Sequence, residues 1–168
     1  MKIIVRIDST WVKDLLRWQH HPDVEKFILG DDPIEDVLSR INDGELIFLG
    51  LEKEGWRGFA TLDMQEDQAE LSLFAPGGRA REAVDVIAKL LSRYPVNKMY
   101  MKVRADRLRK WELYTKKDWE RITRFWGLKF IGLVGDPIGD KPYHILAAKE
   151  IEHGQRQGSN ERSSVGTT

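Results

Sequence analysis

The stretch LSLFAPGGRAREAVDVIAKLL, residues 71–91, decides the fold of this chain. Its first residues alternate as in a strand, Pro76-Gly77-Gly78 breaks that strand, and a helix with a regular apolar face follows. The apolar face of the helix consists of Ala83, Val84, Ile87, Leu90 and Leu91. Another strand is predicted for residues 98–103. Because the connection is too long for a hairpin, the two strands must run parallel if they share a sheet.

Upstream of this unit, the pattern predicts a strand over residues 2–7, a helix from about Thr10, a short helix over residues 23–29 and a helix starting at Asp32 and ending near Asn42. Asp8 or Ser9 caps the first of these helices, whose apolar stripe is Val12, Leu15, Leu16 and Trp18. Apolar runs over residues 45–52, 56–64 and 68–74 follow, with short polar links between them. Such runs are typical of an antiparallel meander.

Downstream, residues 104–117 predict a loop with a helical turn, and Asp118 is expected to cap a short helix that ends at Trp126-Gly127. Strands over residues 128–134 and 143–151 close the domain. The predicted class is α+β, with a mixed, mostly antiparallel sheet, a central parallel β-α-β crossover and flanking helices. We predict one domain over residues 1–151, and a polar tail over residues 152–168 that is disordered unless a partner binds it.

Composition narrows the function classes. The 168 residues have zero net charge, so no global field favours nucleic acid or a membrane surface. Residues 102–117 are nevertheless rich in Lys and Arg, and residues 31–54 are rich in Asp and Glu. The chain has no cysteine, no long apolar run and no apolar leader at its start, which together favour a cytoplasmic protein.

The broken strand and the Arg-bearing helix after it resemble the GNAT acetyltransferase superfamily, and the resemblance extends over roughly residues 2–150. It implies acetyl-CoA as acyl donor. In the family the strand before the break splays from its parallel neighbour and pairs with the pantetheine arm, which here implies a role for Leu73, Phe74 and Ala75. The loop and helix start bind the pyrophosphate, which here implies a role for Gly77, Gly78, Arg79, Ala80 and Arg81. Free N–H groups and the helix dipole suit such an anion.

Two positions depart from the family pattern. Glu82 stands where the family keeps a glycine, and a carboxylate there repels a pyrophosphate. Thr123, in the helix before Trp126-Gly127, stands where the family has the tyrosine that protonates the departing thiolate. A threonine hydroxyl is a poor general acid.

An acetyltransferase also needs a base to accept a proton from the acceptor amine. By position, Glu70 and Asp63 are the candidates, with Glu66 on the turn between them. If Leu71 and Leu73 face the core, alternation places Glu70 and Ser72 on the opposite face. A glutamate on a half-exposed strand is more often a solvated surface residue. No metal site is expected, because the adjacent His20 and His21 point in different directions on a helix.

Two hypotheses remain open. The first is an acetyl-CoA-dependent N-acetyltransferase with weak or no turnover. The second is a non-catalytic GNAT-like protein that acts through a partner protein or self-assembly, as in certain internal virion proteins of phages, which the PGGRAREAV stretch and the missing tyrosine resemble. The basic segment over residues 104–117, with Trp111 and Tyr114 in it, fits a protein-contact or solvated surface better than nucleic acid. In an active enzyme it would instead contact the 3′-phosphate of the cofactor.

Overall fold

The computed structural model describes residues 1–21, 34–105, 108–135 and 142–153. The predicted helix over residues 23–29, the Asp32-Pro33 helix start and the tail from residue 154 lie outside the described residues. The elements follow the predicted order. They are β1 (Lys2–Ile4), α1 (Ser9–Trp18), α3 (Ile34–Asn42), β2 (Ile47–Lys53), β3 (Trp56–Gln65), β4 (Gln68–Phe74), α4 (Ala80–Leu91), β5 (Lys98–Arg104), the 3₁₀ turn η3 (Trp111–Leu113), α5 (Lys116–Phe125), β6 (Lys129–Gly135) and β7 (Pro142–Glu150).

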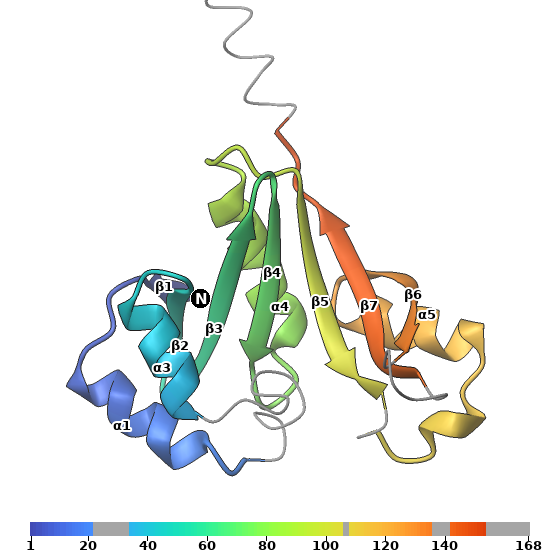
Figure 1. Ribbon diagram of the computed structural model, residues 1–168, viewed down its shortest axis with the longest axis horizontal. Coiled ribbons are helices and arrows are strands. Elements are labelled where there is room, and N and C mark those ends of the chain that lie inside the picture. Colours follow the sequence, from blue (N-terminus) through green and yellow to red (C-terminus); the bar gives the residue numbers. More distant parts are fainter. Residues whose placement is uncertain (22–33, 106–107, 136–141, 154–168) are drawn as a thin grey trace, which may run out of the picture.

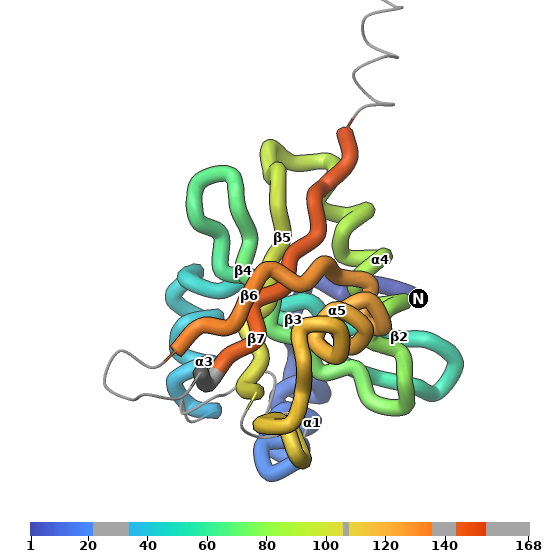
Figure 2. The backbone as a smooth tube through the Cα atoms, turned by 90° about the vertical axis from the view of Figure 1, so that its right-hand side faces the viewer, coloured from blue at the N-terminus to red at the C-terminus, as the bar shows by residue number. Residues whose placement is uncertain are grey.

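One sheet of seven strands, in the order β1-β2-β3-β4-β5-β7-β6, forms the centre of the molecule. All of its pairs are antiparallel except β4 with β5, which α4 connects as a parallel crossover. The predicted α+β class and the predicted crossover are therefore confirmed. Figure 1 shows α4 behind the strands, and Figure 2, turned by 90°, shows α3 and α4 on opposite sides of the sheet.

Each face of the sheet buries its own apolar cluster, because side chains alternate along every strand. Leu71 and Leu73 of β4 pack with Val84 and Ile87 of α4 on one face. On the other face, Phe74 packs with the α1 and α3 residues Trp11, Leu15, Ile34 and Val37. The alternation predicted for β4 is confirmed.

Three local predictions were wrong. The first strand ends at Ile4, and Val5 beyond it is exposed. In α1 the buried residues are Trp11 and Leu15, whereas Leu16 is 43% exposed, because the face that meets the sheet is rotated from the predicted stripe. The helix α5 is capped by Thr115. The Asp118 carboxylate accepts a hydrogen bond from the Thr115 backbone in a capping box, so Asp118 is the third helical residue.

Candidate functional site

The parallel pair β4–β5 opens into a V. Its ladder has three rungs, Gln68–Lys98, Ala69–Met99 and Glu70–Tyr100. Beyond them β4 pairs only with β3, and β5 only with β7, so each strand turns one backbone edge toward the opening. Figure 1 shows the two strands diverging toward their carboxyl ends. An exposed strand edge of this kind can hydrogen-bond an extended ligand.

A cleft of about 170 Å³ lies where the strands have parted. It is lined by Leu73, Ala75, Pro76, Gly77, Gly78, Ala80, Met101, Phe125 and Trp126. Five of the predicted cofactor-binding residues are thus gathered around one cavity. Met101, Phe125 and Trp126 are not among the residues predicted to bind the cofactor. Phe125 stands out because its aromatic ring is 68% exposed, although the buried residues of α5 are Trp119 and Thr123. An exposed aromatic ring beside a cleft indicates a binding role.

The loop between β4 and α4 has the properties of an anion site. Gly77 and Gly78 have φ angles of 73° and 77°, which residues other than glycine rarely adopt. No side chain caps α4 at Arg79, and the first N–H groups of a helix have no partner within it. These groups lie at the positive end of the α4 dipole.

Three of the predicted cofactor-binding side chains lie away from this cleft. Phe74 points to the other face of the sheet, where its ring centroid is 5.7 Å from that of Phe59, so only its backbone belongs to the strand edge. Arg79 donates to Glu82 over 3.1 Å. Arg81 lines a separate, open groove between α4, α5 and the β6–β7 hairpin, and packs against Gly127.

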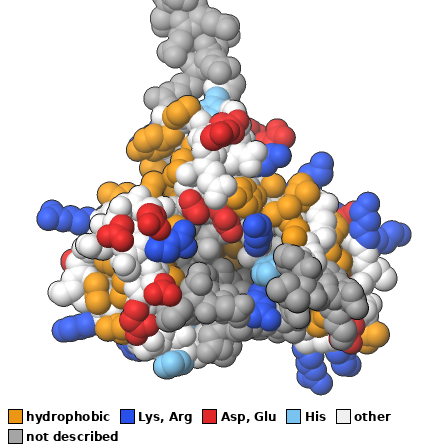
Figure 3. Space-filling model, viewed as in Figure 1, with side chains coloured by type: hydrophobic (Ala, Val, Ile, Leu, Met, Phe, Trp, Pro, Cys, Tyr) orange, Lys and Arg blue, Asp and Glu red, His pale blue; other side chains and the backbone are white. Residues whose placement is uncertain are grey.

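The two predicted bases lie together on the α3 face. Asp63 of β3 and Glu70 of β4 are directly opposite each other in the ladder. They share a pocket of about 130 Å³ with Thr61, Ser72 and three residues at or after α3, namely Val37, Arg40 and Leu46. Arg40 pairs with Asp63 over 3.5 Å and with Glu45 over 3.2 Å. Figure 3 shows acidic side chains gathered on this part of the surface.

Glu70 and Tyr100 form the last rung before the strands part, so both lie at the vertex of the V. The Tyr100 hydroxyl donates to Glu70 over 3.4 Å. Burial, and then the negative charges of Glu70 and Asp63, raise the pKa of Tyr100 above its ordinary value. The phenol is therefore protonated at neutral pH. Tyr100 was missed in the sequence because its partner across the parallel ladder depends on the register.

Thr123, which the resemblance predicts at the position of the family tyrosine, does not line the cleft. Its side chain is fully buried, and its hydroxyl donates to the backbone oxygens of Trp119 and Glu120 over 3.0 and 3.2 Å. This hydroxyl is already committed within α5 and has no route to a ligand.

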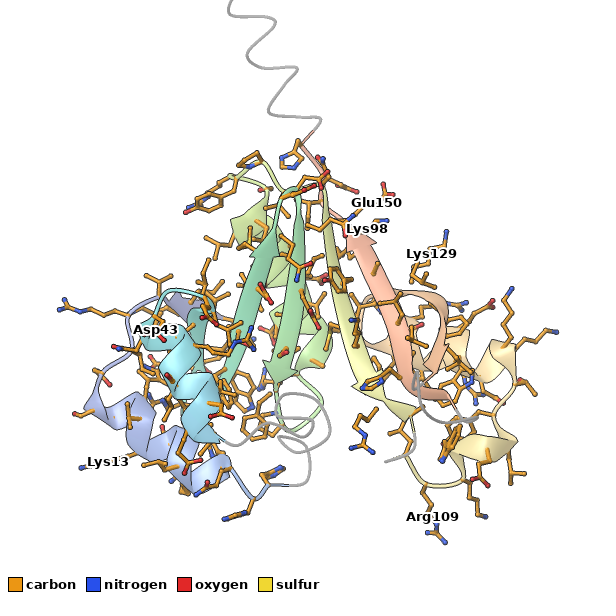
Figure 4. All side chains as sticks on the ribbon, viewed as in Figure 1. Lys13, Asp43, Lys98, Arg109, Lys129 and Glu150 are labelled. Atoms are coloured by element: carbon orange, nitrogen blue, oxygen red, sulfur yellow. The ribbon has the colours of Figure 1, made fainter. Side chains whose placement is uncertain are left out.

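The basic segment starts at Arg104, the last residue of β5, and therefore at the open end of the V. Figure 4 shows Arg109 projecting from the edge of the molecule on the side where β5 ends. In the part of the chain that the structure describes, no three His, Asp or Glu side chains are grouped as metal ligands would be. Over the same residues, no helix is both long enough and apolar enough to cross a membrane.

A seven-stranded sheet with one splayed parallel pair, and a glycine loop leading into a helix at the splay, is the fold of the GNAT acetyltransferases. An aminoglycoside 6′-N-acetyltransferase solved with coenzyme A superposes over 90% of this chain and 98% of its own, with a TM-score of 0.60 and 17% identity. A variant of the spermidine N-acetyltransferase from Vibrio cholerae covers 92% of this chain and 96% of its own, with a TM-score of 0.55 and 11% identity.

A protein of the GNAT family from Desulfovibrio desulfuricans covers 90% of this chain and 98% of its own, with a TM-score of 0.55 and 13% identity. No model of a protein family and no curated protein matches the sequence. Fewer than one residue in five is identical to these structures. The similarity is therefore one of backbone fold.

Proposed function

We propose that this protein is an N-acetyltransferase that binds acetyl-CoA in the β4–β5 cleft and transfers the acetyl group to a primary amine in the Asp63–Glu70 pocket. The observation that carries the proposal is the position of Glu70. Its carboxylate lines the pocket, and its backbone forms the last rung of the parallel ladder, where the cleft begins. A base at the vertex would lie between the acyl donor in the β4–β5 cleft and the acceptor amine in the Asp63–Glu70 pocket.

The described residues fit the acyl donor. The unpaired edge of β4 offers backbone groups to the pantetheine arm, and the Gly77-Gly78 loop with the start of α4 offers N–H groups to the pyrophosphate. Phe125 and Trp126 add an apolar wall. The solved aminoglycoside acetyltransferase with the same fold was crystallised with coenzyme A.

Acetyl-CoA supplies a thioester, whose carbonyl carbon an amine can attack. For that attack the acceptor must be a neutral amine, and Glu70 is positioned to accept the proton that it loses. The new N–C bond would replace the C–S bond. An acceptor that enters as an ammonium ion would lose one proton to solvent before the attack and a second to Glu70 during it. The departing thiolate would take one proton from solvent and Glu70 would return its own, so that one proton is released overall. Asp63, beside Glu70, attracts the acceptor while it is still an ammonium ion.

The acceptor is proposed only as a primary amine. The neighbours named for aminoglycoside and spermidine acetylation act on amines of very different size. What these acceptors share is positive charge, which the two carboxylates of the pocket would attract.

Binding of the acyl donor is tested by calorimetry with acetyl-CoA. Phe125→Ala should weaken binding, because its exposed ring lines the cleft. Tyr94→Ala is the matched control, since Tyr94 is 55% exposed on the turn after α4 and does not line the cleft. No heat at millimolar acetyl-CoA would overturn the proposal.

The base is tested by turnover with a panel of primary amines. Glu70→Gln should lower kcat by about 10²- to 10⁴-fold, the usual contribution of a general base. Glu66→Gln is the control, because Glu66 lies on the β3–β4 turn, outside the pocket. Equal rates for the two variants would remove Glu70 from the mechanism.

The alternative is a non-catalytic protein with this fold, such as a virion or other interaction protein. The burial of the Thr123 hydroxyl favours it, because the residue at the position of the family's general acid then cannot donate a proton to a ligand. It predicts acetyl-CoA binding without turnover, or no binding at all, together with a stable assembly or a co-purifying partner.

A further inference from the structure

The carboxylate of Glu82, in the first turn of α4, pairs with three cations: Lys53, Arg79 and, at 3.9 Å from Oε1, the amino group of Met1. Lys53, at the end of β2, donates to Glu82 Oε1 over 2.6 Å, and Arg79 donates to Oε2 over 3.1 Å. The hydrogen bond from Lys53, with a further one from Arg79, lowers the pKa of Glu82 below its ordinary value of 4.5 despite some desolvation. The carboxylate is therefore charged at neutral pH.

The same contacts determine where Arg79 lies. Its guanidinium is 6.0 Å from the ring centroid of Trp56, whose indole nitrogen donates to the backbone oxygen of Pro76 over 2.9 Å. Gly78 and Ala80, on either side of Arg79, line the cleft, whereas Arg79 does not. Glu82 and Trp56 together hold the arginine on the β3 side of the loop, outside the cleft.

The charges that surround an anion at this loop therefore depend on contacts between elements, which the sequence pattern alone does not reveal. The side-chain cations beside the loop, Lys53 and Arg79, already have Glu82 as a carboxylate partner, and that carboxylate itself repels the anion. We infer that Glu82 is an internal counter-ion that keeps Arg79 and Lys53 from the pyrophosphate of the acyl donor and thereby sets the affinity for coenzyme A. The inference rests on the proposed function.

The experiment compares the binding of coenzyme A and of pantetheine, which lacks the phosphates, to the full chain by calorimetry. Glu82→Gln should tighten coenzyme A by up to about fivefold, given what exposed ion pairs contribute. It should leave pantetheine unchanged. Adding Arg79→Ala to Glu82→Gln should remove most of the gain, because the released arginine is what provides it.

Asp85→Asn is the matched control. It removes one negative charge from the same helix, three residues further on, where the carboxylate pairs with Lys149 over 3.2 Å. It should leave both affinities unchanged. Thermal melting of each variant verifies that the fold is retained.

Three results would overturn the inference alone: an unchanged affinity of Glu82→Gln for coenzyme A, an equal gain in Asp85→Asn, or an equal gain for pantetheine. Coenzyme A binding by the wild type would still stand in each of these cases. If no variant binds coenzyme A, the proposed function fails and the inference fails with it.

Discussion

Replacing Gly58 with alanine tests how tightly the loop before α4 is fixed to the sheet. Gly58 lies on β3. A Cβ atom there would overlap the backbone oxygen of Phe74, the last residue of β4, and would lie 2.7 Å from Cη2 of Trp56. Carbon atoms normally approach to about 3.5–4.0 Å, so both neighbours must move. Trp56 also donates to Pro76, so the change disturbs two attachments of the loop.

The expected cost follows from overpacking, which typically destabilises a protein by about 1–3 kcal/mol. We expect a loss near the middle of that range, since one of the two obstacles is backbone. For a domain of this size, each kcal/mol corresponds to roughly 2–4 °C in Tm. Urea unfolding followed by tryptophan fluorescence measures the free energy, and a thermal melt gives the shift.

Gly132→Ala provides the comparison. Gly132 also lies in a strand, β6, but a Cβ atom there would meet no atom within 4 Å. Alanine should be neutral there, or stabilising by up to about 1 kcal/mol, because it restricts the unfolded chain. If the free energies of unfolding of the two variants agree within about 0.5 kcal/mol, the close approach of Gly58 to Phe74 is not real and the reasoning fails.

Three further predictions concern single side chains. Glu70→Gln should lower the pKa of Tyr100 toward 10.0, since one of the negative charges that raise this pKa disappears. Phenolate absorbance measures the shift, with Tyr100→Phe as the reference. Identical titration curves for the wild type and Glu70→Gln would contradict the prediction. The lowered pKa of Glu82 gives stability that is present above pH 4.5 and lost as the pH falls through the folded-state pKa. Urea unfolding should therefore show the wild type more stable than Glu82→Gln at neutral pH and equal to it in strong acid; a gap that does not depend on pH would refute the ion pairing. Thr123→Tyr should cost about 2 kcal/mol or more, because the site is fully buried, whereas Phe125→Tyr, on an exposed ring, should be neutral in the same assay; equal stabilities would show that position 123 has room for a phenol.

Much of the fold could be predicted from local patterns. The break at Pro76-Gly77-Gly78 and the apolar face of α4 predicted a strand, a helix and a second strand, which are the elements of a parallel crossover. The alternation in β4 placed Glu70 opposite the Leu71 face, since successive side chains point to opposite sides. Caps and stripes were less certain, because Thr115 and Asp118 both suit a helix start and only the backbone conformation distinguishes them.

Local patterns along the chain were enough to predict the α+β class, the element order and the glycine loop. Which residues meet depends on how the strands and helices pack. The register of three rungs put Glu70 and Tyr100 at the vertex, and the return of the β2–β3 hairpin brought Lys53 and Trp56 to Glu82 and Arg79. The physical reason is range: turn chemistry and periodicity act over a few neighbouring residues, whereas the Lys53–Glu82 contact joins positions 29 residues apart that only the packed sheet brings together.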